Sequence, residues 1–478
     1  MNKQTNTLID TSRSEKRSVQ PRARFPLANV AMKIKGLLLT VTALGVLCTA
    51  VNPSFAQSIY APYTFTTLAG LAGSPGSADG ANAAARFDLP TNVRLDGTGN
   101  LFVADFNNNT IRKVTPSGLV TTMAGTAGQP GSADGTNGAA RFNGPNDVVL
   151  DSADNLYVAD FNNNTIRKVT PIGTNWVVTT LAGCATCQVG SADGTNSAAR
   201  FNQPNDVALD SAGNLYVADY GNSTIRKLTP VGPNWVVTTL AGLAGTPGSA
   251  DGTNSAARFY NPGGVAVDST GNLYVGDTGN STIRKLTPVG PNWVVTTLAG
   301  LALSVGNADG TNLTARFHGP VGVALDGAGS LYVADDYNDM VRKVTPVGTN
   351  WVVTSLGGSA SSAGSASGTG SGARFNQLEG VAVDSTGNLY VADTFNDTIR
   401  KGIPASSVPV PTLHPPSLSA GQFGFGITGL PGLELSLEYS YNLSQWAVLR
   451  TFALQGGSNY YSLPTPLQGN RFWRVVVR

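Results

Sequence analysis

The chain has 478 residues, of which 13% are charged and 41% hydrophobic, and it contains three cysteines and two histidines. Residues 1–56 hold eight of the 31 basic and two of the 29 acidic residues, so the remainder carries 23 basic and 27 acidic side chains. A slightly acidic chain without a basic patch lacks the electrostatic footprint of a nucleic-acid-binding protein. We therefore expect no nucleic acid among its partners, and the length leaves room for more than one domain.

The N-terminal segment has the features of an export signal. From Met32 a short basic region leads into an apolar core, and the small residues Ser54 and Ala56 precede a predicted cleavage before Gln57. The apolar run is short for a bilayer span. We predict a signal peptide over 1–56, with Met32 as an alternative start. After its removal we expect no membrane span, and a secreted, periplasmic or cell-surface location.

A repeated pattern fills residues 57–403. Each copy reads A-R-F, then P, then V-x-x-D, then G-N-L-Y-V-A-D, then N-x-T-I-R-K, with small variations. The first arginines of the six copies lie 55 to 59 residues apart, at Arg86, Arg141, Arg200, Arg258, Arg316 and Arg374.

One copy predicts four short strands, at Asp206–Asp210, Leu215–Ala218, Thr224–Thr229 and Trp235–Leu240. They are β-branched and are separated by Gly, Asn, Asp and Pro, which is typical of antiparallel hairpins. Four strands per repeat, repeated radially, indicate a propeller blade. The predicted fold is all-β, a six-bladed β-propeller of four-stranded blades.

The ends of the repeat region predict how the ring closes. Repeats one to five each finish with a strand of the type V-T-T-L-A-G, whereas repeat six stops after Thr398–Gly402. The missing strand stands before repeat one, at Tyr63–Gly70. We expect it to pair beside Thr398–Lys401 as the outer strand of blade six, because this removes an exposed sheet edge.

Three segments stand outside the repeat pattern. Cys184 and Cys187 form C-A-T-C in what we take to be the loop after blade three, and in an exported chain we expect a local disulfide. Residues 404–416 are Pro-rich and predict a stiff linker. Residues 417–478 predict five or six strands, hence a small Ig-like β-sandwich.

The repeat P-x-x-V-A-x-D-x-x-G-N-L-Y-V-A-D-x-x-N-x-x-I-R-K resembles the NHL repeat over about residues 63–403. The resemblance implies a six-bladed propeller, but no single function, since NHL propellers include protein-binding modules, RNA-binding modules and enzymes. The amidating lyase that shares this repeat uses several metal-bound histidines. Outside the signal, this chain has only His318 and His414, so we do not expect that activity.

Positions shared by all six repeats are interpreted as structural. The Asp of V-A-D and the Asn three residues later suit a tight turn. The A-R-F arginine is expected to pair with a turn carboxylate, and its Phe to fill the gap between blades. The loop motif S-A-D-G-T-N lacks EF-hand spacing. Tryptophans that begin the fourth strand of four blades are expected to pack, namely Trp176, Trp235, Trp293 and Trp351.

Two sets of positions differ between repeats. The first, just before the Val of the innermost strand, offers oxygen ligands at Asn92, Asp147, Asp206 and Glu379. The set is similar in ligand type to the axial metal site of six-bladed lactonases of the gluconolactonase type. It would hold calcium or another divalent metal with a metal-bound water. The alternative is a set of ordinary polar residues that line a wet channel.

The second set follows V-A-D and consists of aromatic residues at Phe106, Phe161, Tyr220, Tyr337 and Phe395. Aromatic side chains at turn tips often mark recognition surfaces, and the alternative is that each packs under a neighbouring long loop.

These patterns favour an exported, non-catalytic propeller without a cofactor that binds a protein, peptide or glycan ligand. The alternative is a metal-dependent hydrolase of the gluconolactonase type with its site on the propeller axis. A purely architectural protein is a third possibility, and it would show neither a pocket nor an aromatic patch.

Overall fold

The computed structural model describes residues 62–360 and 362–405, together with strand segments between residues 412 and 477. The predicted signal peptide over 1–56 and most of the linker over 404–416 lie outside the described residues. The predicted domain boundaries therefore stay predictions. Within the described part of the chain, no helix is long and apolar enough to cross a membrane.

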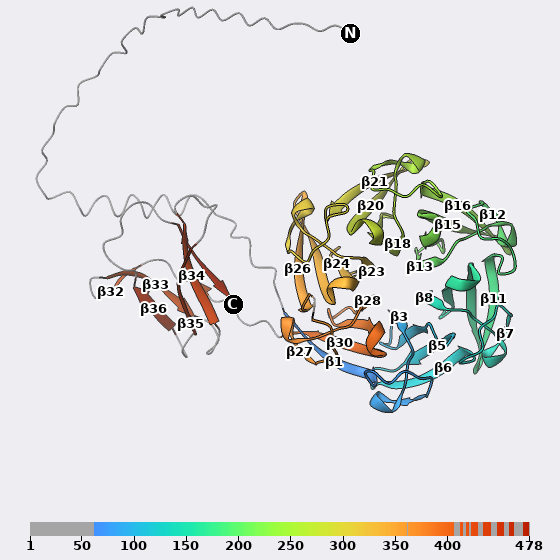
Figure 1. Ribbon diagram of the computed structural model, residues 1–478, viewed down its shortest axis with the longest axis horizontal. Coiled ribbons are helices and arrows are strands. Elements are labelled where there is room, and N and C mark those ends of the chain that lie inside the picture. The colour runs from blue at the N-terminus through green and yellow to red at the C-terminus, as the bar shows by residue number, and fades with distance from the viewer. Residues whose placement is uncertain are drawn as a thin grey trace, which may run out of the picture. The chain divides into compact units, whose positions relative to one another are not determined.

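Six antiparallel sheets stand around a central axis, which confirms the all-β, six-bladed propeller (Figure 1). From the axis outward, the first blade consists of β3 (Pro90–Leu95), β4 (Leu101–Asp105), β5 (Thr110–Val114), β6 (Leu119–Gly125) and β2 (Gly80–Ala81). The two-residue outermost strand was not predicted, because a G-A or G-T pair in a Gly-rich loop carries no periodic signal.

The next four blades repeat this order. The second has β8 (Pro145–Leu150), β9 (Leu156–Asp160), β10 (Thr165–Ile172), β11 (Asn175–Gly183) and β7 (Gly135–Thr136). The third has β13 (Pro204–Leu209), β14 (Leu215–Asp219), β15 (Thr224–Val231), β16 (Asn234–Gly242) and β12 (Gly194–Thr195). The fourth has β18 (Pro262–Val267), β19 (Leu273–Asp277), β20 (Thr282–Val289), β21 (Asn292–Ala299) and β17 (Gly252–Thr253). The fifth has β23 (Pro320–Leu325), β24 (Leu331–Asp335), β25 (Met340–Val347), β26 (Asn350–Gly358) and β22 (Gly310–Thr311).

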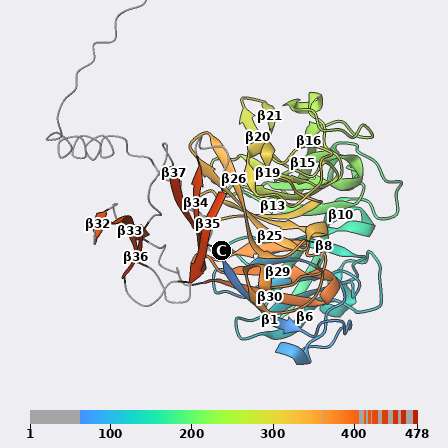
Figure 2. The same ribbon diagram turned by 60° about the vertical axis from the view of Figure 1, so that its left-hand side comes forward.

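The sixth blade joins the two ends of the repeat region. It consists of β28 (Gly380–Val383), β29 (Leu389–Asp393), β30 (Thr398–Pro404), β1 (Tyr63–Gly70) and β27 (Gly368–Thr369). Thr66 pairs with Lys401 and Phe65 with Gly402, so the predicted closure by the N-terminal strand is confirmed. Figures 1 and 2 show β1 alongside β30.

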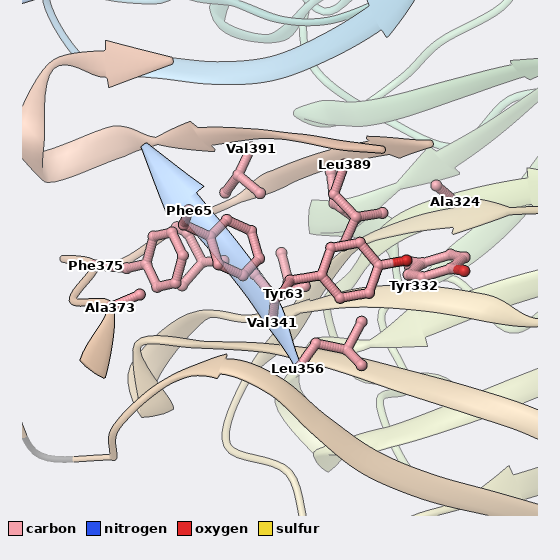
Figure 3. Packing of buried hydrophobic residues seen from close by; sticks show 13 residues of the cluster. Tyr63, Phe65, Ala324, Tyr332, Val341, Leu356, Ala373, Phe375, Leu389 and Val391 are labelled. Carbon is pink, nitrogen blue, oxygen red and sulfur yellow. The ribbon is translucent and has the colours of Figure 1, made fainter. Parts of the chain in front are cut away.

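A volume exchange fits the closing strand into blade six. Phe65 stands where blade three has Val237, and its partner across the strands is Gly402 where blade three has Leu228. A Cβ at Gly402 or Gly357 would collide with the Phe65 ring. The ring is fully buried and meets Phe375 edge to face at 5.0 Å between centroids (Figure 3). One large ring and two glycines thus take the place of the usual aliphatic residues, as close packing of the core requires.

The hydrophobic cores lie between blades, because successive side chains of a strand point to opposite faces of the sheet. In β14, Leu215 and Val217 pack against the second blade, while Tyr216 and Ala218 pack against the fourth. All five residues of this strand are buried. The aromatic ring of each A-R-F motif, for example Phe201, is buried in these inter-blade cores, as predicted.

The arginine of I-R-K, and not that of A-R-F, pairs with the turn carboxylate. Arg226 is fully buried, donates to Asp219 at 2.8 Å, and stacks 5.2 Å from the centre of the Phe201 ring. The A-R-F arginine, Arg200, instead donates to the carbonyls of Ser197 and Ala199. The prediction for the A-R-F arginine was wrong because its guanidinium reaches back over its own 3-10 turn. Six buried arginines repeat the pairing, namely Arg112, Arg167, Arg226, Arg284, Arg342 and Arg400.

The V-A-D turn has the structural role that its sequence predicts. Asp219 accepts hydrogen bonds from Arg226, from the backbone of Asn202 and from the side chain of Asn222. Asn222 also donates to the carbonyl of Gly190 in the long loop. The same Asp–Asn–Arg arrangement occurs in every blade, so the six-fold set of carboxylates belongs to the framework.

A second acid supports the arginine in five blades and is replaced in the sixth. In blade three Asp193 accepts from Arg226 at 2.8 Å and also from the backbone and hydroxyl of Thr239 on the fourth strand. In blade six the corresponding residue is Ser367. Within the described residues Arg400 pairs with one carboxylate, that of Asp393, and its other amino group donates to a carbonyl.

The C-terminal strands form two antiparallel sheets. One contains β31 (Thr412–Leu413), β33 (Gln422–Thr428), β32 (Ser417–Ser419) and β36 (Ser458–Ser462). The other contains β35 (Ala447–Ala453), β34 (Glu434–Ser440) and β37 (Phe472–Val477). The strands β32 to β37 agree with the five or six strands predicted for residues 417–478. β31 lies in the segment that was predicted to be a linker. The Ig-like sandwich stays a prediction.

Replacement of one buried arginine tests the framework. We expect Arg226→Met to lower the free energy of unfolding by about 3–5 kcal/mol, because it leaves Asp219 buried without its cation. Guanidinium denaturation measures the change. The neighbouring Lys227→Met removes the same charge from a partly exposed side chain and should shift stability by about 0.5 kcal/mol or less. Equal denaturation midpoints for the two variants would contradict a framework role for Arg226.

Restoring the missing acid of blade six tests the closure. We expect Ser367→Asp to raise the free energy of unfolding by up to about 1 kcal/mol, since a half-exposed carboxylate would meet Arg400 and the closing strand at Thr67. Thermal unfolding measures it. Ser365→Asp adds the same charge to an exposed position of the same loop and should have no stabilising effect. A similar shift from both variants would show that net charge, and not the pairing, is responsible.

Candidate functional site

All five aromatic residues predicted at the V-A-D turns line one pocket at the propeller axis, which we call the aromatic pocket. Its volume is about 270 Å³, and it is lined by residues of all six blades. Phe106, Phe161 and Tyr220 are half-buried, while Tyr337 and Phe395 are 52% and 48% exposed. Side chains that lie far apart in the sequence therefore meet because the ring returns equivalent turns to one face.

Three of the rings form a continuous arc across blades one to three. Phe106 and Phe161 lie 6.0 Å apart between centroids, and Phe161 and Tyr220 lie 6.4 Å apart. Phe106 also rests on the loop of the next blade, where a Cβ at Gly144 would come within 2.8 Å of its ring. Packing under a neighbouring loop and a role in recognition are thus compatible, because the loop holds the Phe106 ring in place while the ring lines the pocket.

A circle of hydrogen bonds joins each blade to the next around the pocket. Each bond runs from a side chain or backbone amide at the inner end of one blade to a carbonyl of the following blade. The six donor–acceptor pairs are Thr91–Asn146, Asn146–Asn205, Asn205–Gly263, Thr278–Pro320, Gly322–Glu379 and Thr394–Pro90, at 2.7 to 2.9 Å. Because these bonds link all six blades in turn, the base of the pocket is pre-organised.

Two acidic residues share the pocket with the aromatic rings. Asp336 stands at the turn position that Phe106 occupies in blade one, is 7% exposed, and has no hydrogen-bond partner for its Oδ1 atom. Burial raises the pKa of Asp336 to about 8, and the nearby Glu379, Asp339 and Asp335 add to the shift. Burial also raises the pKa of Glu379 to about 7. Sequence reasoning missed Asp336, although the doubled acid in V-A-D-D-Y was a visible departure.

The four residues proposed as metal ligands take two different places. The Arg94 guanidinium lies 3.3 Å from Asp147 and 3.1 Å from Asp206, and the Asn92 side chain donates to Asp206. Glu379 instead lines the aromatic pocket with Asp336.

Arg94 thus supplies a positive charge beside Asp147 and Asp206. Burial and the neighbouring Asp147 raise the pKa of Asp206 well above its usual range, against the opposing charge of Arg94. In the described part of the chain, no three His, Cys, Asp or Glu side chains are grouped to hold a metal ion. Arg94 was missed, although other blades have Val or Ala at its position.

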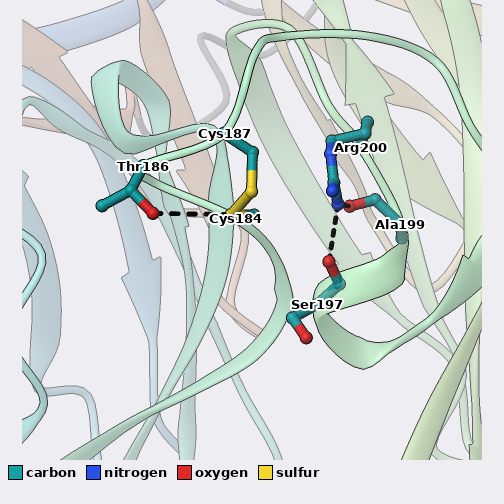
Figure 4. Close-up of a disulfide and its surroundings, with 6 residues drawn as sticks. All are labelled: Cys184, Thr186, Cys187, Ser197, Ala199 and Arg200. Atoms are coloured by element: carbon teal, nitrogen blue, oxygen red, sulfur yellow. Dashed lines mark hydrogen bonds between the residues drawn. A yellow bond between two sulfur atoms is a disulfide. The ribbon is translucent and has the colours of Figure 1, made fainter.

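Cys184 and Cys187 form a disulfide that staples one loop (Figure 4). The loop follows β11, so it connects the second blade to the third; our placement of it after blade three was wrong. Neither cysteine lines the aromatic pocket. The disulfide is therefore a local constraint on a connection between blades.

Comparisons with known proteins agree with this architecture. The NHL repeat model matches residues 142–169, 201–228 and 259–286. The chain is 29% identical over 344 residues to NHL repeat-containing protein 2 of Bos taurus, covering 65% of this chain and 46% of that protein. It is 28% identical over 327 residues to SUPPRESSOR OF QUENCHING 1 of Arabidopsis thaliana, covering 65% and 30%. The chain thus spans less than half the length of these relatives.

Solved structures show the same fold at lower identity. A protein of unknown function from Bacteroides thetaiotaomicron is 21% identical, with a TM-score of 0.53 over 72% of this chain and 76% of that one. An auxiliary nutrient binding protein from Bacteroides ovatus is 18% identical, with a TM-score of 0.54 over 73% and 78%. Fold and pocket define a six-bladed propeller with an axial recess. The chain carries NHL repeats on this propeller.

The buried Asp336 predicts that the stability difference between the unchanged protein and an Asp336→Asn variant depends on pH. Folded Asp336 keeps its proton up to about pH 8, whereas in the unfolded chain it ionises near pH 4. The folded state binds more protons between these values, so stability falls as pH rises through this window. We expect Asp336→Asn to melt at least about 2 °C above the unchanged protein at pH 8.5, with the gap vanishing near pH 4. The exposed Asp154→Asn is the control, and a gap independent of pH would contradict the assignment.

Proposed function

We propose that this protein is a non-catalytic binding module that takes part of a protein, peptide or glycan ligand into the aromatic pocket. The observation that carries the proposal is the convergence of five aromatic residues from five blades on one recess at the axis. Exposed aromatic groups in a concave site recognise ligands through large contact area at low entropic cost.

The architecture of the pocket supports this role. Ligand sites are mostly apolar recesses with a few well-placed polar groups, and this pocket combines aromatic walls with two acids and several amide and hydroxyl side chains. The circle of inter-blade hydrogen bonds holds the pocket in one shape, which lowers the entropic cost of binding.

Two fold neighbours from Bacteroides are described as auxiliary nutrient binding proteins. At 18% and 17% identity they share the fold, and their description supports a binding role in general terms. The predicted signal peptide and the disulfide favour an exported protein that acts in the periplasm, at the surface or outside the cell.

A metal-dependent hydrolase of the gluconolactonase type is the alternative proposal. It requires a divalent ion to replace Arg94 among Asn92, Asp147 and Asp206. Arg94 already pairs with Asp147 and Asp206 at 3.3 and 3.1 Å, and this internal ion pair favours binding over metal catalysis. Metal content of the purified protein tests the alternative, and a stoichiometric divalent ion would support it.

Aromatic truncation tests the binding role. We expect Phe106→Ala, Phe161→Ala and Tyr220→Ala to weaken binding of a hit from glycan and peptide arrays at least tenfold each. The reason is that a well-packed aromatic anchor contributes about 1.4 kcal/mol or more. Affinities of the full chain are measured by calorimetry. Ile172→Ala, at an exposed hairpin tip at the opposite end of the strands, is the control. Unchanged affinity in all three aromatic variants would rule out the pocket.

A further inference from the structure

The charge of the aromatic pocket is one-sided. Its ionisable acidic lining residues are Asp336 and Glu379, and among the described residues no Lys, Arg or His side chain lines it. We propose that the aromatic pocket binds a protonated amine group of its ligand, held by these two carboxylates and by the surrounding aromatic rings. This inference rests on the proposed binding function and specifies the chemistry of the group that enters.

Asp336 is the acid of the pocket that has an unpartnered oxygen. It is 93% buried, since its exposure is 7%, yet its Oδ1 atom accepts no hydrogen bond. The neighbouring turn acid, Asp335, is paired with Arg342 at 2.8 Å. An unpaired buried carboxylate is costly. A ligand with N–H donors and a positive charge would remove that cost, so the site is complementary to an ammonium group.

Comparison with the other blades shows that this acid is not needed by the frame. The equivalent residues of blades one to three are Phe106, Phe161 and Tyr220, and those of blades four and six are Thr278 and Thr394. Both threonine hydroxyls are used in the circle of hydrogen bonds. In blade five, the backbone amide of Gly322 makes the corresponding link to Glu379. The Asp336 carboxylate is therefore left over for a ligand.

The aromatic walls add to the preference for a cation. A ring face attracts a cation within about 6 Å with roughly 0.5–2 kcal/mol, depending on desolvation. The same chain already uses such contacts internally, as at Lys343 over Tyr332 at 5.0 Å. Arg94, the nearby internal cation, is engaged by Asp147 and Asp206. A volume of about 270 Å³ admits an aminoalkyl group and excludes a folded domain.

The surroundings of the acids give binding a pH signature. Around Asp336 stand Glu379, Asp339, which accepts from the backbone of Gln377, and Asp335, which is neutralised by Arg342. His318 lies against Tyr337, 5.0 Å between ring centroids. Since Asp336 and Glu379 have raised pKa values of about 8 and 7, a cation should bind more tightly as pH rises from 6 to 8.5, while a neutral ligand should not.

Calorimetry of the full chain with matched probes tests the inference. The probes are Nα-acetyl-lysine methylamide, the same compound acetylated on its side-chain amine, and n-butylammonium. We expect the charged lysine probe to bind at least tenfold more tightly than its acetylated form, and more tightly at pH 8.5 than at pH 6. Asp336→Asn and Glu379→Gln should each weaken it at least fivefold, and Asp154→Asn should leave it unchanged. If n-butylammonium binds as tightly as the lysine probe, the ligand group is a free amine. If it binds much more weakly, the amine belongs to a peptide.

The outcomes separate the inference from the proposed function. Equal affinity for the two lysine probes, or no effect of the acid variants, would overturn the amine inference. If Phe161→Ala still weakens both probes, the pocket binds a neutral group and the proposed function stands. If neither acid nor aromatic variants alter binding, the ligand lies elsewhere and both fail. Absence of binding by every probe overturns the amine inference, and array hits then decide the proposed function alone.

Discussion

The propeller depends on a buried arginine that is repeated once in every blade. In blade three, Arg226 joins the turn acid Asp219, the ring of Phe201 and the long loop that precedes the blade. A charge held at zero exposure is tolerated only where its partners are fixed in place. The arginine thus ties together segments about 33 residues apart in the sequence, and it aligns the V-A-D turn with the loop of its own blade. Disturbing it affects every other contact of the blade.

Because these contacts fix the backbone of each blade, the residues that line the aromatic pocket can differ from blade to blade. The acid of the V-A-D turn is held by three hydrogen bonds, so the next residue can change without altering the backbone. Phenylalanine, tyrosine, threonine and aspartate all occur there in this chain. The aromatic pocket is built from these tolerated differences, and Asp336 is the difference that leaves a carboxyl oxygen without a hydrogen-bond partner. Stability and recognition are therefore assigned to neighbouring residues of the same turn.

Much of the fold could be predicted from the sequence because repetition multiplies a weak signal. A single run such as L-Y-V-A-D is ambiguous, but six copies with turn residues between them indicate four-stranded blades. The closing strand was predictable because Tyr63–Gly70 resembles the fourth strand of the other repeats. The aromatic residues were found as departures from the repeat. The partner of the turn acid was assigned to the wrong arginine because both arginines are equally regular in sequence and only side-chain direction separates them.

The sequence by itself determined the number of blades, the order of their strands, the closure and the residues of the aromatic set. These follow from local patterns and from their period. Only the tertiary structure decided which variable residues meet: it placed Arg94 between Asp147 and Asp206, and it moved Glu379 from the expected metal group to the side of Asp336. The physical reason is that ring closure brings together inner ends of blades more than 100 residues apart, and no local pattern records the direction of a side chain at the axis.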